Sequence, residues 1–466
     1  MKEQKWGLLL LTAFVVGNMV GGGIFQLPAT LAQVASPFGI LASWGITGIG
    51  VFFLAIVFGR LAILKPELSN GPQDYAAALF KNPRAKHIAG YSMVWGYWAA
   101  NWPSTAAVII SFSGYLSTFF PILKSNRILF SLGNLTVYEG NLMTFLVSSL
   151  LLWGIQLILQ LNYNDAGKIN LLPTIMKVLG FLLFMIVALS AFQLSHFTPF
   201  SYPVIDQNGG KHGILEQMNS GAISTLWAFI GIESAIMLYN RAKSGKDVER
   251  ATILGLVVAL VIYIGITILT IGALPMKELM HSTSPLVDAF DRALGGGYGR
   301  YILAFIACLA LLGSVVGWVI VSTEVPFIAA QKGYMPDYFA KISPSGCPVR
   351  SLTITNLFTQ LFLFSILSKT LNQAFMFGIE VSTLAYLVPY LISSLFMLKI
   401  AYTREIFNNE HAERNMTIFI SICAFIYSCW VVITGTAQLV TFSLGIGLFL
   451  FGFILYPFFH RSRKII

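Results

Sequence analysis

The sequence contains few charged residues. Only 10% of its 466 residues are charged, whereas 56% are hydrophobic. A soluble chain would carry about a quarter charged residues, because its surface must be hydrated. The shortage excludes a soluble globular protein and predicts that lipid covers most of the surface. The N-terminal apolar run lacks a small-residue cleavage site, so we predict a retained span and not a signal peptide.

Other absences narrow the function. The four cysteines follow no metal-ligand or disulfide spacing, and the six histidines are scattered. The glycine-rich stretch 295–300 lacks the Gly-Lys-Ser/Thr ending of an ATP-binding loop. No nucleophile–base constellation is present, which argues against a membrane enzyme. We therefore predict no cofactor and no metal, and the +10 charge, which lies between apolar segments, indicates no nucleic acid partner.

Long apolar segments dominate the chain, and about 20 residues suffice to cross a bilayer. Twelve segments qualify: 7–33, 38–63, 88–120, 142–162, 169–192, 219–240, 251–273, 301–329, 351–367, 372–398, 415–433 and 436–459. No soluble domain fits between them. We predict an all-α integral membrane protein of twelve transmembrane helices, with residues 1–466 forming a single domain.

Lysine and arginine are distributed unequally between the two sets of connections. The termini and the loops on their side carry 21 of them, the opposite loops carry 7, and Lys177 lies inside a span. Because cytoplasmic loops carry the excess of basic residues, both termini are predicted to be cytoplasmic, in a multi-pass protein of the cell membrane.

Glycine interrupts the first and sixth spans. Gly21, Gly22 and Gly23 are consecutive, and Gly231 lies mid-span. Glycine costs a helix about 1 kcal/mol relative to alanine, and unwound backbone at membrane depth must line a cavity or be buried. Paired breaks indicate a transporter's binding site. The two breaks are five spans apart, and because five is odd, the second half would enter the membrane from the opposite side. This predicts an inverted repeat of residues 1–192 and 219–398, followed by two additional helices at 415–459. Close helix packing is the alternative reason for the glycines.

Half-helix ends at mid-membrane suit the carboxylate and ammonium of an α-amino acid. Glu233 follows the second break, and a buried carboxylate there is costly and usually functional, so we predict a proton or gating role. A structural hydrogen bond is the alternative. Glu380 and Lys177 are further candidates, although Lys177 is close enough to the cytoplasmic end to snorkel. Glu324 lies nearer that end and could simply reach water.

We predict three acidic residues within the membrane, Glu233, Glu324 and Glu380, and one basic residue, Lys177. This excess of acids favours a cationic solute, and aromatic residues support the same interpretation. The indoles and rings concerned are Trp95, Tyr97, Trp98, Trp102, Trp227, Phe229 and Trp318. Interfacial anchoring is the alternative for some of them. Asn101, Ser104 and Thr105 add polar groups to the third span.

Two strings, GNMVGGGIFQLPATLA and TLWAFIGIESA, resemble the amino acid–polyamine–organocation permeases. NRAKSGKDVERATILG is similar to the arginine/ornithine antiporter branch, whereas ANWPSTAAVIISFSGYLSTFFPILK and STLAYLVPYL are similar to the arginine/agmatine branch. The resemblance covers nearly the whole chain. It implies a LeuT-type five-plus-five inverted repeat with two extra C-terminal helices, in which helices 1 and 6 are broken.

The resemblance also implies a set of site residues. Substrate contacts fall on Gly21, Gly22, Gly23, Ile24, Asn101, Thr105, Trp227, Gly231, Trp318 and Ser382, and proton or gating roles fall on Glu233, Lys177 and Glu380. Lys177 resembles a lysine that replaces a sodium ion in sodium-independent relatives. The sequence departs from the arginine/agmatine branch at Gly22, where that branch has serine, and at Thr105, where it has asparagine; Asn101 lies one turn away.

These observations predict a secondary transporter that exchanges arginine or lysine for ornithine, agmatine or a related amine without sodium. Its partners would be amino acid or amine substrates and the lipid bilayer; a homodimer is left open. Proton-coupled uptake or exchange of a neutral or acidic amino acid is the alternative. An amino-acid-binding membrane sensor is more remote, because the chain has no soluble output domain.

Overall fold

The computed structural model describes most of the chain, namely residues 5–68, 71–132, 135–163, 171–205, 210–233, 236, 239, 242–403, 407, 411–435 and 439–459. The helices in this part are α1 (Leu8–Met19), α2 (Gly23–Val34), α3 (Pro37–Leu64), α4 (Pro72–Ala78), α5 (Pro83–Leu116), α6 (Glu139–Asn162), α8 (Leu171–Ser190), α9 (Ile214–Trp227), α11 (Gly245–Ala273), α12 (Met276–Leu279), α13 (Pro285–Ala293), α14 (Gly299–Gln331), α15 (Val349–Leu363), α16 (Leu371–Tyr402), α17 (His411–Gly435) and α18 (Leu439–Phe459). Short 3-10 turns are η1 (Pro121–Lys124), η3 (Leu194–Phe197), η5 (Asp337–Ala340) and η6 (Phe364–Leu367), and the strands are β1 (Ile128–Leu132), β2 (Leu135–Tyr138), β3 (Val204–Ile205) and β4 (Lys211–His212).

The protein is a helical membrane protein. Eight helices in the described residues are long and apolar enough to cross a membrane, or nine when α1 and α2 count as one span bent by 47°. The segment expected at 88–120 forms the long helix α5. Its Trp, Ser and Asn side chains lower its mean hydropathy, and α5 is not among these eight helices. In the segment expected at 219–240, helix α9 ends at Trp227, and part of residues 234–240 lies outside the described residues. The first residues of the segments expected at 169–192 and 436–459 also lie outside them.

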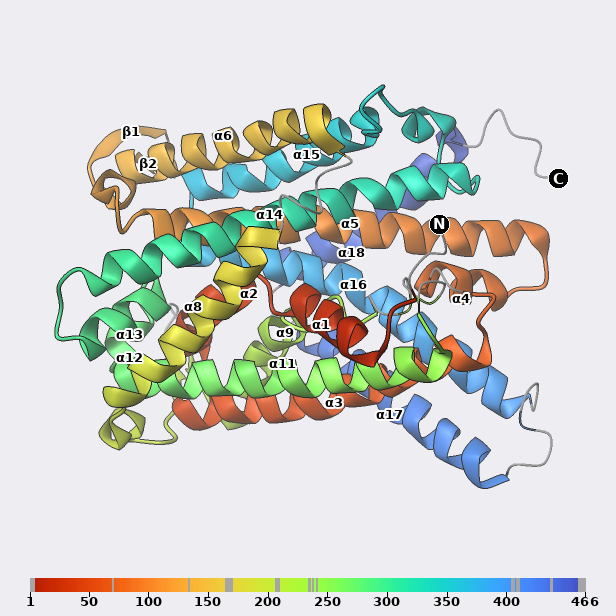
Figure 1. The fold of residues 1–466 in the computed structure, drawn as a ribbon, viewed down its shortest axis with the longest axis horizontal. Coiled ribbons are helices and arrows are strands. Elements are labelled where there is room, and N and C mark those ends of the chain that lie inside the picture. Colours follow the sequence, from red (N-terminus) through yellow and green to blue (C-terminus); the bar gives the residue numbers. More distant parts are fainter. Residues whose placement is uncertain are drawn as a thin grey trace.

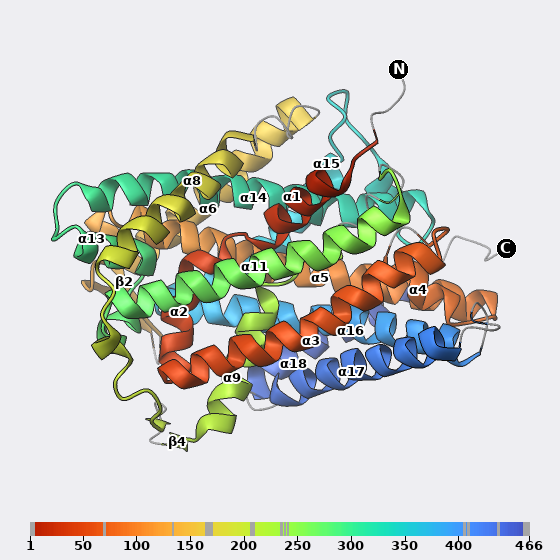
Figure 2. The ribbon, with the colours of Figure 1, turned by 60° about the horizontal axis from the view of Figure 1, so that its bottom comes forward.

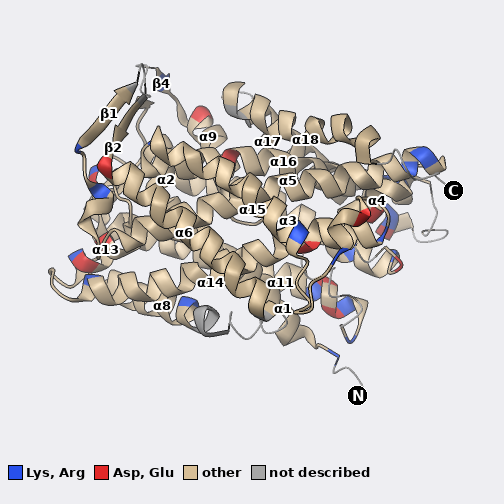
Figure 3. Ribbon diagram, turned by 90° about the horizontal axis from the view of Figure 1, so that it is seen from above, with Lys and Arg blue, Asp and Glu red and all other residues tan. Residues whose placement is uncertain are grey.

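Two groups of long helices flank the broken elements. On one side α3 and α11 lie side by side along their length (Figures 1 and 2). On the other side α5 packs against both α14 and α16. The short helices α1, α2 and α9 lie between these groups (Figure 1). Charged residues gather mostly at the two ends of the bundle, which leaves a central apolar band as lipid requires (Figure 3).

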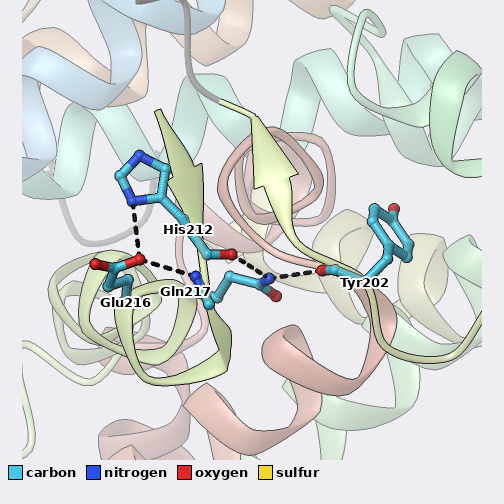
Figure 4. Close-up of polar contacts among 5 residues, drawn as sticks. Tyr202, His212, Glu216 and Gln217 are labelled. Carbon is cyan, nitrogen blue, oxygen red and sulfur yellow. Dashed lines mark hydrogen bonds and ion pairs between the residues drawn. The ribbon is translucent and has the colours of Figure 1, made fainter. Parts of the chain in front are cut away.

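The loop before α9 fixes where this helix begins. The Gln217 side-chain amide donates to the carbonyl oxygens of Tyr202, at 2.7 Å, and His212, at 3.1 Å (Figure 4). Its carbonyl oxygen accepts from the backbone N–H of Ser36, the residue preceding α3, at 2.9 Å. Glu216 accepts from the Gly213 N–H at 2.8 Å and so caps the helix start. One buried glutamine therefore joins the starts of α3 and α9.

Candidate functional site

The first span is broken between Met19 and Gly23. Here the neighbouring side chains approach the backbone so closely that only glycine fits. A Cβ on Gly22 would lie 2.7 Å from a Val108 methyl carbon, and one on Gly23 would lie 2.3 Å from the Trp227 ring. Close approach therefore explains Gly22 and Gly23, whereas a Cβ on Gly21 would meet no atom nearer than 3.7 Å.

Backbone carbonyls exposed by this break receive donors from other helices. The Lys177 ammonium, on α8, is buried and donates to the carbonyl oxygens of Val20, at 2.9 Å, and Gly17, at 3.3 Å. The Tyr263 hydroxyl, on α11, lies 2.6 Å from the Met19 carbonyl. Lys177 thus points to the break, in contrast to the snorkelling alternative.

The second break begins where α9 ends, at Trp227. Gly231 has φ +103°, a conformation that favours glycine because other residues are strained there. A Cβ on Gly231 would lie 3.5 Å from the backbone of Asn18. The Tyr263 hydroxyl, which contacts Met19, also lies 2.6 Å from the Ala228 carbonyl. The two breaks therefore meet, and one phenol bonds to both.

Glu233 lies two residues after Gly231 and is fully buried. The Tyr97 hydroxyl, on α5, donates to its Oε1 at 2.8 Å, and the Tyr390 hydroxyl, on α16, donates to its Oε2 at 3.0 Å. Since both oxygens accept, an ionised carboxylate satisfies this arrangement, and a proton on one oxygen would reverse the direction of that hydrogen bond, because a phenol oxygen can also accept. The state of Glu233 is thereby linked to two long helices.

Trp227 is held by serine hydroxyls. Its indole N–H donates to Ser104 Oγ at 2.9 Å. The hydroxyls of Ser104 and Ser382 are hydrogen-bonded, and Ser382 donates to the Ala100 carbonyl at 2.9 Å. These contacts join α9 to α5 and α16 beside the first break.

Two further polar residues lie one turn apart on α5. The Asn101 carbonyl oxygen accepts from the Tyr386 hydroxyl, and no partner is found for the Asn101 amide nitrogen within the described part of the chain. Thr105 Oγ1 donates to the Asn101 backbone carbonyl at 2.8 Å and lies 3.4 Å from Ser322 Oγ on α14. The Asn101 amide is thus a buried donor without a protein acceptor in that region.

The remaining candidates are placed as follows. Trp318, on α14, approaches the first break: its Nε1 would lie 3.8 Å from a Cβ on Gly21. Ile24, in the first turn of α2, is buried. Glu380 is buried on α16, two residues before Ser382. Residues two apart on a helix point to different faces, so Glu380 does not share the face of Ser382.

Three indoles of α5 do not support the cation argument made from the sequence. Trp95 donates to the Leu448 carbonyl at 2.8 Å, and Trp98 donates to Thr355 Oγ1 at 2.9 Å. Trp102 stacks on Phe358, with ring centroids 4.1 Å apart. These contacts show that the three indoles pack α5 against α15 and α18.

Sequence reasoning missed Tyr390, a partner of Glu233, and Tyr263, which contacts both breaks. It named Tyr97 and Ser104 but did not predict that they contact Glu233 and Trp227. The available signal was tyrosine in apolar spans, since a buried phenol usually needs a hydrogen-bond partner. Among the described residues, no group of three or more His, Cys, Asp or Glu is placed to hold a metal ion.

The fold and the joined breaks define a multi-pass membrane protein with an interrupted, polar centre. The family profile described as "Amino acid permease" matches residues 7–459. A putative arginine/ornithine antiporter of Bacillus subtilis is 50% identical over 457 residues, which cover 98% of this chain and 97% of that protein. An arginine/ornithine antiporter of Pseudomonas aeruginosa is 30% identical over 438 residues, covering 93% and 86%. A putative amino-acid transporter of Clostridium perfringens is 32% identical over 473 residues, covering 99% and 92%.

The chain belongs to the amino acid permease family. It is a membrane transporter of amino acids and not an enzyme.

Proposed function

We propose that this permease exchanges arginine for ornithine across the cell membrane by alternating access, without sodium. The names of the similar proteins from Bacillus subtilis and Pseudomonas aeruginosa support this substrate pair. In the proposed topology both termini are cytoplasmic and twelve spans form an inverted repeat of 1–192 and 219–398, with 415–459 added. The two observed breaks, five expected spans apart, support this repeat.

The observation that carries the proposal is the meeting of the two breaks at Tyr263. The amino acid head group would lie on the unwound backbone from Gly21 to Ile24 and on Gly231. Half-helix ends supply N–H groups for the carboxylate and carbonyls for the ammonium. Lys177 donates to the Gly17 and Val20 carbonyls, which would otherwise attract a metal cation, and this supports sodium independence.

The substrate side chain would extend between Trp227 and Trp318, beside Asn101, Thr105 and Ser382. Cationic side chains stack favourably on indole faces. Glu233 would couple protonation or occupancy to the movement of α5 and α16, because its two phenol partners lie on those helices. Glu380 lies on the same helix as Tyr390 and is proposed as a secondary charge in this movement.

Exchange can be tested with the purified protein in liposomes loaded with arginine, ornithine or buffer alone. We expect uptake of labelled arginine only into vesicles that contain arginine or ornithine. Uptake that does not depend on internal substrate would contradict exchange. Absence of uptake for every cationic amino acid would contradict the substrate class.

Proton-coupled transport of a neutral or acidic amino acid is the second candidate. One observation favours it: both oxygens of the buried Glu233 carboxylate accept hydrogen bonds from phenol hydroxyls, which are uncharged partners that can also carry a proton. A panel of unlabelled amino acids, together with an imposed pH gradient, separates the two functions. Competition by arginine, lysine and ornithine alone supports exchange of cations, whereas competition by neutral or acidic amino acids and stimulation by the gradient support the alternative.

A further inference from the structure

The hydrogen bonds around Trp227 can run in only one direction. An indole N–H is solely a donor, so Ser104 accepts from Trp227. A backbone carbonyl is solely an acceptor, so Ser382 donates its one hydroxyl proton to the Ala100 carbonyl. In the bond between the two serines, Ser104 must therefore donate to Ser382. The result is a satisfied chain from Trp227 through Ser104 and Ser382 to Ala100.

The indole is also fixed by packing. A Cβ on Gly23 would lie 2.3 Å from the ring, which shows that the ring rests directly on the backbone of the first break. Phe375, on α16, meets the ring edge-on, with centroids 5.8 Å apart. Trp227 is only 4% exposed, and both serines are fully buried. The ring is thus held by glycine and phenylalanine, and its nitrogen is held by Ser104.

We propose that Ser104 and Ser382 are positioning residues that hold the Trp227 indole in one orientation and thereby set the preference for a planar cationic side chain. This inference rests on the proposed function, and it changes the role of Ser382. Its proton is committed to Ala100, so Ser382 acts through Ser104 and Trp227 instead of donating to the substrate.

The orientation matters more for arginine than for ornithine. A guanidinium is planar and delocalised, and it stacks on an aromatic face only when the two planes are aligned. An ammonium is a compact charge that tolerates a rotated ring. Freeing the indole should therefore weaken arginine selectively, whereas general damage to the fold would weaken both substrates alike.

The selectivity test compares Ser104→Ala and Ser382→Ala with Ser113→Ala. Ser113, also on α5, shares a hydroxyl–hydroxyl contact of 2.9 Å with Ser148 and serves as the matched control. We expect the KM for arginine to rise roughly three- to tenfold in the first two variants, the effect of losing one hydrogen bond, and that for ornithine to change less. Should Ser104→Ala fail to fold, Ser382→Ala interrupts the same chain from its other end.

Combining Ser104→Ala with Trp227→Phe tests whether the serines act through the indole. Trp227→Phe retains a ring but removes the N–H donor. We expect Ser104→Ala to add no further loss of arginine preference in this background. The proposal would be overturned if Ser104→Ala left the ratio of the KM values for arginine and ornithine unchanged. It would also be overturned if Ser104→Ala reduced the preference for arginine equally in the wild-type and Trp227→Phe backgrounds.

A spectroscopic measurement separates this inference from the proposed exchange. In protein labelled with 5-fluorotryptophan, the ¹⁹F resonance of Trp227 is assigned by its absence in Trp227→Phe. We expect this resonance to shift in Ser104→Ala and Ser382→Ala and to stay in place in Ser113→Ala. An unmoved resonance in the first two variants refutes the relay. If the wild-type protein exchanges no arginine for ornithine, the proposed function fails, and this resonance still decides whether the serines position the indole.

Discussion

The two halves of the first broken span have equal length and very different surroundings. In α2, residues 23–32 are all buried. In α1 only Leu11, Val15 and Met19 are buried, and Leu9 is 86% exposed. Both helices contain 12 residues, so length does not explain the difference. The neighbours do: α1 packs chiefly on α11, whereas α2 packs on α9, α11, α13 and α5.

Hydrogen bonds repeat this contrast. Along α2, Gln26 donates to the Asn372 side chain, Gln33 donates to the Met280 carbonyl at 2.7 Å, and the Phe25 carbonyl accepts from Tyr115 at 2.6 Å. The tertiary bonds of α1 lie near its two ends, at the break and at Trp6, whose carbonyl accepts from Lys243 at 2.9 Å. The end of the bundle around α2 is the more tightly packed one, and we infer that it is the closed end, whereas α1 has fewer constraints on movement.

Gly23→Ala should produce the largest effect. Its Cβ would lie 2.3 Å from the Trp227 ring, so the ring or the break must move. We expect arginine–ornithine exchange to fall roughly 100-fold, the upper range of overpacking costs. Gly17→Ala is the control, because a Cβ there meets nothing within 4 Å. Equal losses in both variants would contradict the contrast between α2 and α1.

Glu233→Ala tests the second break, whose Gly231 lies against Asn18 near the end of α1. Removing the carboxylate leaves the hydroxyls of Tyr97 and Tyr390 without their acceptor. We expect exchange to fall roughly 30-fold, as for loss of hydrogen bonds to a charged group, and the remaining activity to vary less with pH. The measurement is initial exchange rate against pH in wild type and variant. A profile of unchanged shape would remove Glu233 from any proton role.

Lys177→Met should loosen the end of α1 at the break. The change removes the donor to the Val20 and Gly17 carbonyls and retains an apolar side chain of similar length. We expect roughly a tenfold lower exchange rate, since two carbonyls lose a charged donor. Lys399→Met is the matched control, because Lys399 also donates to two carbonyls, Ala78 and Leu79, at the end of α4. Equal losses of exchange rate in Lys177→Met and Lys399→Met would show that hydrogen bonding to helix-end carbonyls alone explains the effect of Lys177.

Gln26→Leu should loosen the closed end by a smaller amount. On the proposed orientation, weakening the bond to Asn372 favours the outward-facing state. The KM for external arginine in right-side-out vesicles should then fall about threefold, the effect of one hydrogen bond on a two-state equilibrium. Gln156→Leu is the control, because Gln156 accepts from Asn356 at 3.0 Å between α6 and α15. A higher or unchanged KM in Gln26→Leu would contradict the role of α2 as the closed half.

Local patterns in the sequence were sufficient for most of the long helices and for both breaks, but not for the short helices α4, α12 and α13 between them. Runs of apolar residues define helices, and glycine acts within its own few residues, so 21–23 and 231 could be recognised directly. The partners of Glu233 could not, because Tyr97 lies 136 residues before it and Tyr390 lies 157 residues after it. The face of α5 was also unknown from sequence. Trp98 and Asn101 are neighbours in the chain, but only the packing of α15 assigns the indole to the scaffold.

The hydroxyl of Tyr263 carries one proton and has two carbonyl oxygens at the same distance of 2.6 Å. The two carbonyl oxygens therefore share this proton in a three-centre hydrogen bond. A displacement that lengthens the contact to Met19 is offset by a stronger bond to Ala228, and the reverse is equally true. During such a displacement Tyr263 keeps a hydrogen bond to at least one of the two breaks, so its hydroxyl is not left without an acceptor when the breaks shift relative to each other.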